Sequence, residues 1–235
     1  MLTAGQAAIV TGASSGIGRA IACALAARGA RITLVGRSAA KLHETARAAG
    51  PAAQVLTADV TDEDGRARIA AAAGPALGVL VHSAGAHERN GIATLDAASL
   101  RRMAAINLEA PLLLTAACLA PLRQGRGQVV FINSSAALRP GYAEVLGYAA
   151  SKAALRAAAD ALRAEVNPDG IRVLSVFPGR TDTPMQAAIL AAEGRHAGQG
   201  ALLAPADVAA MVLAALTLPA TAEVTEIVLR PMRKL

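Results

Sequence analysis

Short apolar runs alternate with longer segments of helical periodicity along nearly the whole chain. The apolar runs are rich in Val, Ile and Leu and do not alternate strictly with polar residues, which is typical of strands buried on both faces of a parallel sheet. The strands that this pattern predicts are Ala7–Thr11, Arg31–Gly36, Gln54–Ala58, Val79–His82, Gln128–Asn133, Ile171–Phe177 and Glu226–Arg230.

Helical windows separate these strands, near 16–28, 38–49, 62–73, 97–123, 147–166, 186–193 and 205–217. We expect the window at 97–123 to break into two helices near Pro111. The alternation predicts an α/β fold: a single Rossmann-type, doubly wound domain with a seven-stranded parallel sheet and helices on both faces. The irregular stretch near 184–204 is predicted to be a mobile substrate loop or lid.

Composition excludes several kinds of protein. Alanine supplies 61 of the 235 residues, and the uncharged run 208–222 is shorter than the roughly 18–20 apolar residues of a membrane helix. We therefore expect no membrane span. With no signal-peptide pattern and two cysteines far apart in sequence, we expect a cytoplasmic protein.

The net charge of +6 suits an anionic ligand, but the arginines are scattered and aromatic residues make up only 2% of the chain. A nucleic-acid partner is therefore not expected, and a phosphorylated small ligand fits better. The histidines at 43, 82, 87 and 196 lack the clustered spacing of metal ligands, so no metal site is expected.

A glycine-rich loop joins the first predicted strand to the first predicted helix. Glycines let the backbone approach a pyrophosphate, and a helix N-terminus offers N–H donors to it. A plain tight turn is the alternative. The residues of this loop that we expect to bind a dinucleotide are Gly12, Ser14, Ser15, Gly16, Ile17 and Gly18.

The end of the second predicted strand indicates which dinucleotide is bound. An NAD site commonly has a carboxylate there, which holds the ribose 2′-hydroxyl. Here Gly36 occupies that position and is followed by Arg37 and Ser38. Arg37 is suited to pair with a 2′-phosphate, so NADP(H) is expected over NAD(H). The alternative is that Arg37 is a solvated residue at a helix start.

Tyr148 and Lys152 are the candidate acid/base pair. They are four residues apart at the start of a helical window and thus share one helix face. An ammonium group on that face stabilises a tyrosinate and lowers the phenol pKa.

The chain resembles the short-chain dehydrogenase/reductase family in its common form, nearly from end to end. The motifs that carry the resemblance are TGASSGIG at 11–18, Ala58-Asp59-Val60, HSAG at 82–85, Asn107, Asn133-Ser134-Ser135, YAASK at 148–152, and Pro178-Gly179 with Thr183. Together they form a highly specific set.

The resemblance implies a role for each catalytic candidate. Tyr148 would exchange a proton with the substrate oxygen, while Lys152 would lower the phenol pKa and hold the nicotinamide ribose. Asn107 would position a water that links Lys152 to solvent. Ser135, thirteen residues before Tyr148, would hydrogen-bond the substrate oxygen. Ser134 is the alternative, and only the spacing favours Ser135.

The resemblance also completes the cofactor site. Asp59 and Val60 would contact adenine, and Thr183 would bond the nicotinamide carboxamide. The other expected contacts are Ala84, Gly85, Pro178, Gly179 and, through its backbone, Thr181. The implied activity is hydride transfer between NADP(H) and a carbonyl or secondary alcohol. The alternative is an NADP-binding sensor or scaffold on the same fold without turnover.

One motif departs from the family pattern, and the placement of the loop that follows it has two interpretations. His82-Ser83 stands where the family usually has Asn-Asn, so His82 must replace the bracing of the central strands or that bracing is lost. His87 and Glu88 are predicted to lie in a solvated loop; the alternative is that they face the active site.

The substrate is expected to be a small carbonyl or alcohol in an apolar pocket. Its predicted contacts are Leu138, Tyr142 and Met185, with further apolar residues at 145, 146 and 189. Alanines crowd the window at 147–166, and small side chains allow close helix approach. Because the family often associates through this helix, a homodimer or homotetramer is expected.

Overall fold

A single parallel sheet forms the centre of the molecule. The computed structural model describes residues 4–138, 143–198 and 200–233, within which seven strands pair in the order β3-β2-β1-β4-β5-β6-β7. All six strand pairings are parallel. The strands are β1 Ala7–Thr11, β2 Arg31–Gly36, β3 Ala53–Thr57, β4 Val79–His82, β5 Gln128–Ile132, β6 Arg172–Pro178 and β7 Glu226–Leu229. The predicted single-domain, doubly wound fold is confirmed, with strand ends moved by one residue in places.

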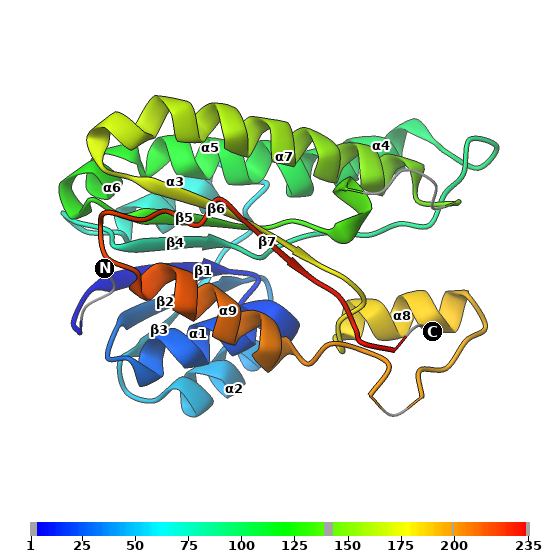
Figure 1. Cartoon of the computed structure of the whole chain (residues 1–235), viewed down its shortest axis with the longest axis horizontal. Helices are drawn as coiled ribbons and strands as arrows, with labels where there is room; N and C mark the ends of the chain where they lie inside the picture. The colour runs from blue at the N-terminus through cyan, green and yellow to red at the C-terminus, as the bar shows by residue number, and fades with distance from the viewer. Residues whose placement is uncertain (1–3, 139–142, 199, 234–235) are drawn as a thin grey trace.

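Helices cover both faces of the sheet (Figure 1). One face carries α1 Gly16–Ala27, α2 Ala39–Ala49 and α9 Pro205–Thr217, and the other carries α3 Glu63–Ala71, α4 Ala97–Ala104, α5 Ala110–Ala117, α6 Leu119–Gly125 and α7 Leu146–Val166. Each face has its own hydrophobic core, because buried strand residues such as Val10 and Ile9 point alternately to the two sides. Helix α8, Pro184–Ala192, follows β6 at the carboxyl edge of the sheet.

The helical window at 97–123 does not break at Pro111. Helix α4 runs through a π-helical turn, Ala105–Glu109, into α5, and Pro111 lies in the first turn of α5. The wide π turn accommodates the proline, which has no backbone N–H to give to a regular ladder. The break comes at Cys118, where the chain bends by 61° into α6.

Length and composition exclude a membrane span for any single helix among the described residues. The segments Ala97–Ala117 and Leu119–Gly125 pass the same criteria only when taken together across that bend.

Candidate active site

The expected site residues gather at the carboxyl edge of the sheet, where the loops after β1, β4, β5 and β6 meet. Thr11, the last residue of β1, ties two of these loops together. Its hydroxyl donates to the Val81 carbonyl (3.2 Å) and accepts from the backbone N–H groups of Ser83 (3.1 Å) and Ala84 (3.3 Å). The predicted phosphate loop and the HSAG turn are thereby held against each other.

The glycines of the phosphate loop are required by close backbone approach. A Cβ on Gly12, which has a φ of +65°, would lie 2.6 Å from the Ala84 nitrogen. A Cβ on Gly18 would collide with the carbonyl group of Gly12. Helix α1 begins at Gly16, and its N-cap residue Ser15 makes no side-chain capping bond. The first-turn N–H groups are therefore left for a ligand, which fits the pyrophosphate of a dinucleotide.

The end of β2 carries no side chain at Gly36. A Cβ there would lie 3.4 Å from the Leu42 side chain and 3.7 Å from the Ser14 hydroxyl. The Arg37 side chain is 77% exposed, with its guanidinium 4.0 Å from the Asp59 carboxylate. Ser38 caps the N-terminus of α2. Although burial raises the pKa of Asp59, its hydrogen bonds from Thr61 and the charge of Arg37 hold it below the ordinary value.

Tyr148 and Lys152 lie in the first two turns of α7, which brings both onto the sheet edge. Lys152 is buried, and its ammonium donates to the Ile132 carbonyl at 2.9 Å. Burial lowers the pKa of Lys152 to about 8. Burial raises the pKa of Tyr148, and a hydrogen bond with the Ser134 hydroxyl opposes that rise. The protein groups therefore keep the phenol protonated, opposite in sign to the expectation from Lys152.

A side-chain hydrogen bond joins Ser134 to the Tyr148 phenol. Ser134 is the N-cap of the 3₁₀ turn Ser135–Ala137, and its hydroxyl accepts from the Ala136 N–H at 3.2 Å. Ser135 is the first residue inside that turn and contributes its carbonyl to the Leu138 N–H. The spacing of thirteen residues points to Ser135, whereas the hydroxyl bonded to the phenol belongs to its neighbour Ser134; which of the two orients a substrate stays a prediction.

Asn107 is buried in the π turn and joins three segments. Its amide nitrogen donates to the Ala86 carbonyl (2.9 Å) and the Ser151 hydroxyl (3.0 Å), and its oxygen accepts from the Ala86 N–H (2.9 Å). Ser151 in turn donates to the Tyr148 carbonyl at 2.8 Å. Ser151 was not among the expected site residues, although its place beside Lys152 in YAASK is a signal that points to it.

His82 replaces the missing strand bracing. Its ring stacks on Phe131 of β5 with centroids 5.0 Å apart, and its Nε2 lies 2.8 Å from the Thr115 hydroxyl of α5. Burial lowers the pKa of His82 to about 3, so the ring is neutral. Strands β4 and β5 and helix α5 are thus joined by one side chain.

Comparisons with known proteins agree with this geometry. Residues 6–194 match the family described as short chain dehydrogenase. The chain belongs to the short-chain dehydrogenase family. An uncharacterized oxidoreductase of Staphylococcus epidermidis is 34% identical over 229 residues, which cover 96% of each chain. An uncharacterized oxidoreductase of Staphylococcus aureus is 33% identical over 230 residues, again covering 96% of each.

Solved structures similar to this short-chain dehydrogenase hold nicotinamide cofactors. A variant of actinorhodin polyketide ketoreductase with NADPH superposes with a TM-score of 0.88 at 27% identity, covering 97% of this chain and 96% of the other. An alcohol dehydrogenase from Thermococcus sibiricus complexed with 5-hydroxy-NADP gives 0.86 at 27% identity and 97% of both chains. This dehydrogenase is therefore an oxidoreductase whose fold binds a nicotinamide cofactor.

The loop after β6 places the last expected cofactor residues of the dehydrogenase. Thr183 caps α8 by accepting from the Gln186 N–H, and its methyl carbon would lie 2.8 Å from a Cβ built on Gly16. The loop after β6 and the phosphate loop are thus in contact. Thr181 is buried, and its hydroxyl donates to the Gly179 carbonyl, which leaves its backbone for any contact with a ligand.

The structure describes two of the three expected substrate contacts, whose role stays a prediction. Leu138 closes the 3₁₀ turn after β5, and Met185 lies in the first turn of α8 with 39% of its surface exposed. Tyr142 lies outside the described residues.

His87, for which a solvated loop was expected, is half-buried with its ring against Tyr148, while Glu88 forms an ion pair with Arg102.

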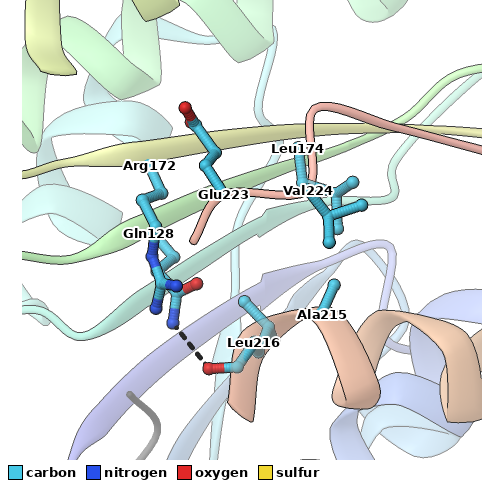
Figure 2. A pocket seen from close by; sticks show the side chains of 7 residues that line it. All are labelled: Gln128, Arg172, Leu174, Ala215, Leu216, Glu223 and Val224. Atoms are coloured by element: carbon cyan, nitrogen blue, oxygen red, sulfur yellow. Dashed lines mark hydrogen bonds between the residues drawn. The ribbon is translucent and has the colours of Figure 1, made fainter. Parts of the chain in front are cut away.

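Two small cavities differ in their relation to this site. One lies at the carboxyl edge and is lined by Thr11, Val60, His82, Ala84, Ile106, Ala110, Pro111 and Leu114, so it adjoins Val60, one of the two expected adenine contacts. Figure 2 shows the other, where β5 and β6 begin and α9 ends. There Gln128 donates to the Leu216 carbonyl at 3.0 Å. This second cavity lies at the amino ends of the strands and so is remote from Tyr148.

Proposed function

We propose that this short-chain dehydrogenase is an NADP(H)-dependent oxidoreductase that interconverts a carbonyl compound and a secondary alcohol. The observation that carries the proposal is the Tyr148 phenol, bonded to Ser134 and followed one turn later by buried Lys152, beside the glycine cradle. The bound nicotinamide supplies or accepts the hydride at the carbonyl carbon.

Tyr148 handles the proton. In reduction the phenol gives its proton to the substrate oxygen as that oxygen gains negative charge, and the phenol is left as tyrosinate. A phenol whose pKa is raised by burial is protonated before reaction, which suits this direction. In oxidation the tyrosinate takes the alcohol proton, and that state needs the positive charge of Lys152 and of the oxidised ring nearby.

Replacement of Tyr148 by Phe tests the proposal directly. We expect Tyr148→Phe to bind NADPH as the unchanged protein does, because the ring stays in place, and to lose turnover of a carbonyl panel. Unchanged turnover in Tyr148→Phe would refute the assignment. Cofactor binding by the unchanged protein without turnover of any carbonyl would instead support a sensor or scaffold.

Ser134 is proposed as the residue that orients the substrate oxygen, in place of Ser135. Ser134→Ala should reduce turnover, while Ser135→Ala, its matched control one residue away, should leave most of it. A second readout needs no cofactor. The chain has two tyrosines and no tryptophan, so ultraviolet titration of Tyr142→Phe reports Tyr148 alone. Ser134→Ala should raise that pKa further because the hydrogen bond that lowers it is lost. A larger loss of turnover in Ser135→Ala than in Ser134→Ala would instead assign the substrate oxygen to Ser135.

The preference for NADP(H) is proposed from the end of β2. Exposed Arg37, the missing side chain of Gly36 and the α2 N-terminus at Ser38 together suit a 2′-phosphate. A charge-assisted bond of roughly 1.5–3 kcal/mol corresponds to about 10- to 150-fold in affinity. Calorimetric titration with NADPH and NADH at one ionic strength should show this difference, and Arg37→Ala should remove most of it. Equal affinity in the unchanged protein would contradict the preference.

A further inference from the structure

His87 lies directly against the proposed acid/base residue. It follows the HSAG turn after β4, and its ring centroid is 4.7 Å from that of Tyr148 with the planes tilted by 59°. The side chain is half-buried. The imidazole therefore forms part of the immediate surroundings of the Tyr148 ring.

Arg89 fixes the loop that carries His87. Its guanidinium forms an ion pair with Glu144, just before α7, and donates to the Ala192 carbonyl at the end of α8 (3.2 Å). Close by, Arg180 and Glu193 form a two-point ion pair with both distances 2.8 Å. Three segments far apart in sequence are thus joined to the loop that carries His87.

The imidazole presents a hydrogen-bond acceptor. Burial lowers the pKa of His87, as do the charges of Arg180 and Arg89, against the opposing effects of Glu193 and of a hydrogen bond to the histidine's own backbone. The ring is therefore neutral near neutral pH, with one nitrogen donating to its own backbone carbonyl. In a neutral imidazole the other nitrogen is an acceptor. Among residues 4–138, 143–198 and 200–233, no protein group is bonded to that nitrogen.

We propose that His87 is a specificity residue that accepts a hydrogen bond from a hydroxyl on the carbon next to the reacting one. The substrates that this arrangement fits are α-hydroxy ketones and the vicinal diols they form on reduction. The proposal rests on the proposed function, because it needs the reacting oxygen to be at Tyr148. The proposal places the neighbouring hydroxyl beside the imidazole, because the ring of His87 packs against the ring of Tyr148.

A matched pair of substrates tests the proposal. We compare kcat/KM for α-hydroxyacetophenone and acetophenone in the unchanged protein, His87→Phe and His87→Asn. His87→Phe keeps a flat ring but removes the acceptor, so the preference for the hydroxy ketone should fall about tenfold, the effect of one hydrogen bond. His87→Asn restores an acceptor and should recover part of the preference. The quantity compared between variants is the ratio of kcat/KM for the two ketones. The greater intrinsic reactivity of the hydroxy ketone raises this ratio equally in every variant, so it does not affect the comparison.

Controls separate this role from a structural one. NADPH affinity by calorimetry should be the same in His87→Phe and the unchanged protein, and exposed His43→Phe on α2 should leave the substrate preference unchanged. Equal losses on both ketones in His87→Phe would overturn the proposal while leaving the proposed function intact. Turnover of neither ketone, nor of any other carbonyl, by the unchanged protein would refute the proposed function instead.

Acidification provides an independent readout. The groups that face His87 are Arg89 from its own loop, Tyr148 from α7, Arg180 from the loop after β6 and Glu193 from the end of α8. As the pH falls through the His87 pKa, the acceptor nitrogen gains a proton and can only donate to the substrate hydroxyl, so the preference for the hydroxy ketone should change in the unchanged protein. The same change in His87→Phe would assign it to another group and contradict the proposal.

Discussion

The tautomer of His82 follows from the hydrogen bonds around it. The Thr115 hydroxyl donates its single proton to the Pro111 carbonyl at 2.7 Å. It can therefore only accept from His82, whose Nε2 must carry a proton. A neutral ring with its proton on Nε2 donates to the Thr115 hydroxyl, and the face of the ring stacks on Phe131. The imidazole does by stacking and one hydrogen bond what the family commonly does with an asparagine.

Acid should destabilise the protein through His82. The pKa is about 3 in the folded chain and about 6.5 when unfolded, so the unfolded state binds more protons between these values. The contribution is fully present above the unfolded value and falls by up to about 1.4 kcal/mol per pH unit as the pH drops toward the folded value. Urea unfolding over this range should show that slope. His82→Asn should reduce it, and exposed His43→Asn should not. Equal slopes in His82→Asn and the unchanged protein would contradict this account.

The backbone of the phosphate loop is packed against the HSAG turn after β4. Gly12 takes a left-handed conformation and faces Ser83 and Ala84, which the Thr11 hydroxyl holds in place. The position of the loop thus depends on β4 as well as on its own residues. The cradle and the HSAG turn form one unit.

Substitution of Gly12 by Ala should disrupt this unit. The left-handed φ costs a residue with a side chain roughly 1–3 kcal/mol, and the new Cβ meets the Ala84 nitrogen. We expect NADPH affinity to fall by more than about tenfold, or about 1.4 kcal/mol, measured by calorimetry. Gly198→Ala, at a site with open space, is the control. Unchanged affinity in Gly12→Ala would mean that the loop does not contact the cofactor.

The molecule as a whole leaves a row of small residues uncovered. Helix α7 lies on one face of the sheet and buries Leu155 and Ala159 against it. Its outer side carries exposed alanines with a spacing of three or four residues: Ala150, Ala153, Ala157, Ala161 and Ala164. Family members are typically oligomeric, and such a surface permits close approach of a second helix.

A homodimer or homotetramer that uses α7 should be sensitive to charge on this row. Ala157→Glu should shift size-exclusion elution toward the monomer, because the interface would bury an unpaired carboxylate. Exposed Ala48→Glu on α2 adds the same charge elsewhere and should leave the elution unchanged. A monomer in the unchanged protein would refute the expected assembly.

The sequence by itself determined the layered fold and pointed to the candidate site. Buried apolar runs and helical periodicity are local patterns, and they predicted seven parallel strands close to their observed ends. The four-residue spacing of Tyr148 and Lys152 lies within one helix, so it also needs no tertiary information. The tertiary structure decided the rest. Pro111 did not break its helix because a π turn precedes it.

Ser134, His82 and His87 could not be assigned by counting residues. Which serine meets Tyr148 depends on the path of the chain between β5 and α7, and the partners of His82 come from β5 and α5. His87 reaches Tyr148 across sixty-one positions of sequence. Contacts between distant segments are fixed by packing in three dimensions, whereas the periodicity of a sequence records only its neighbours along the chain.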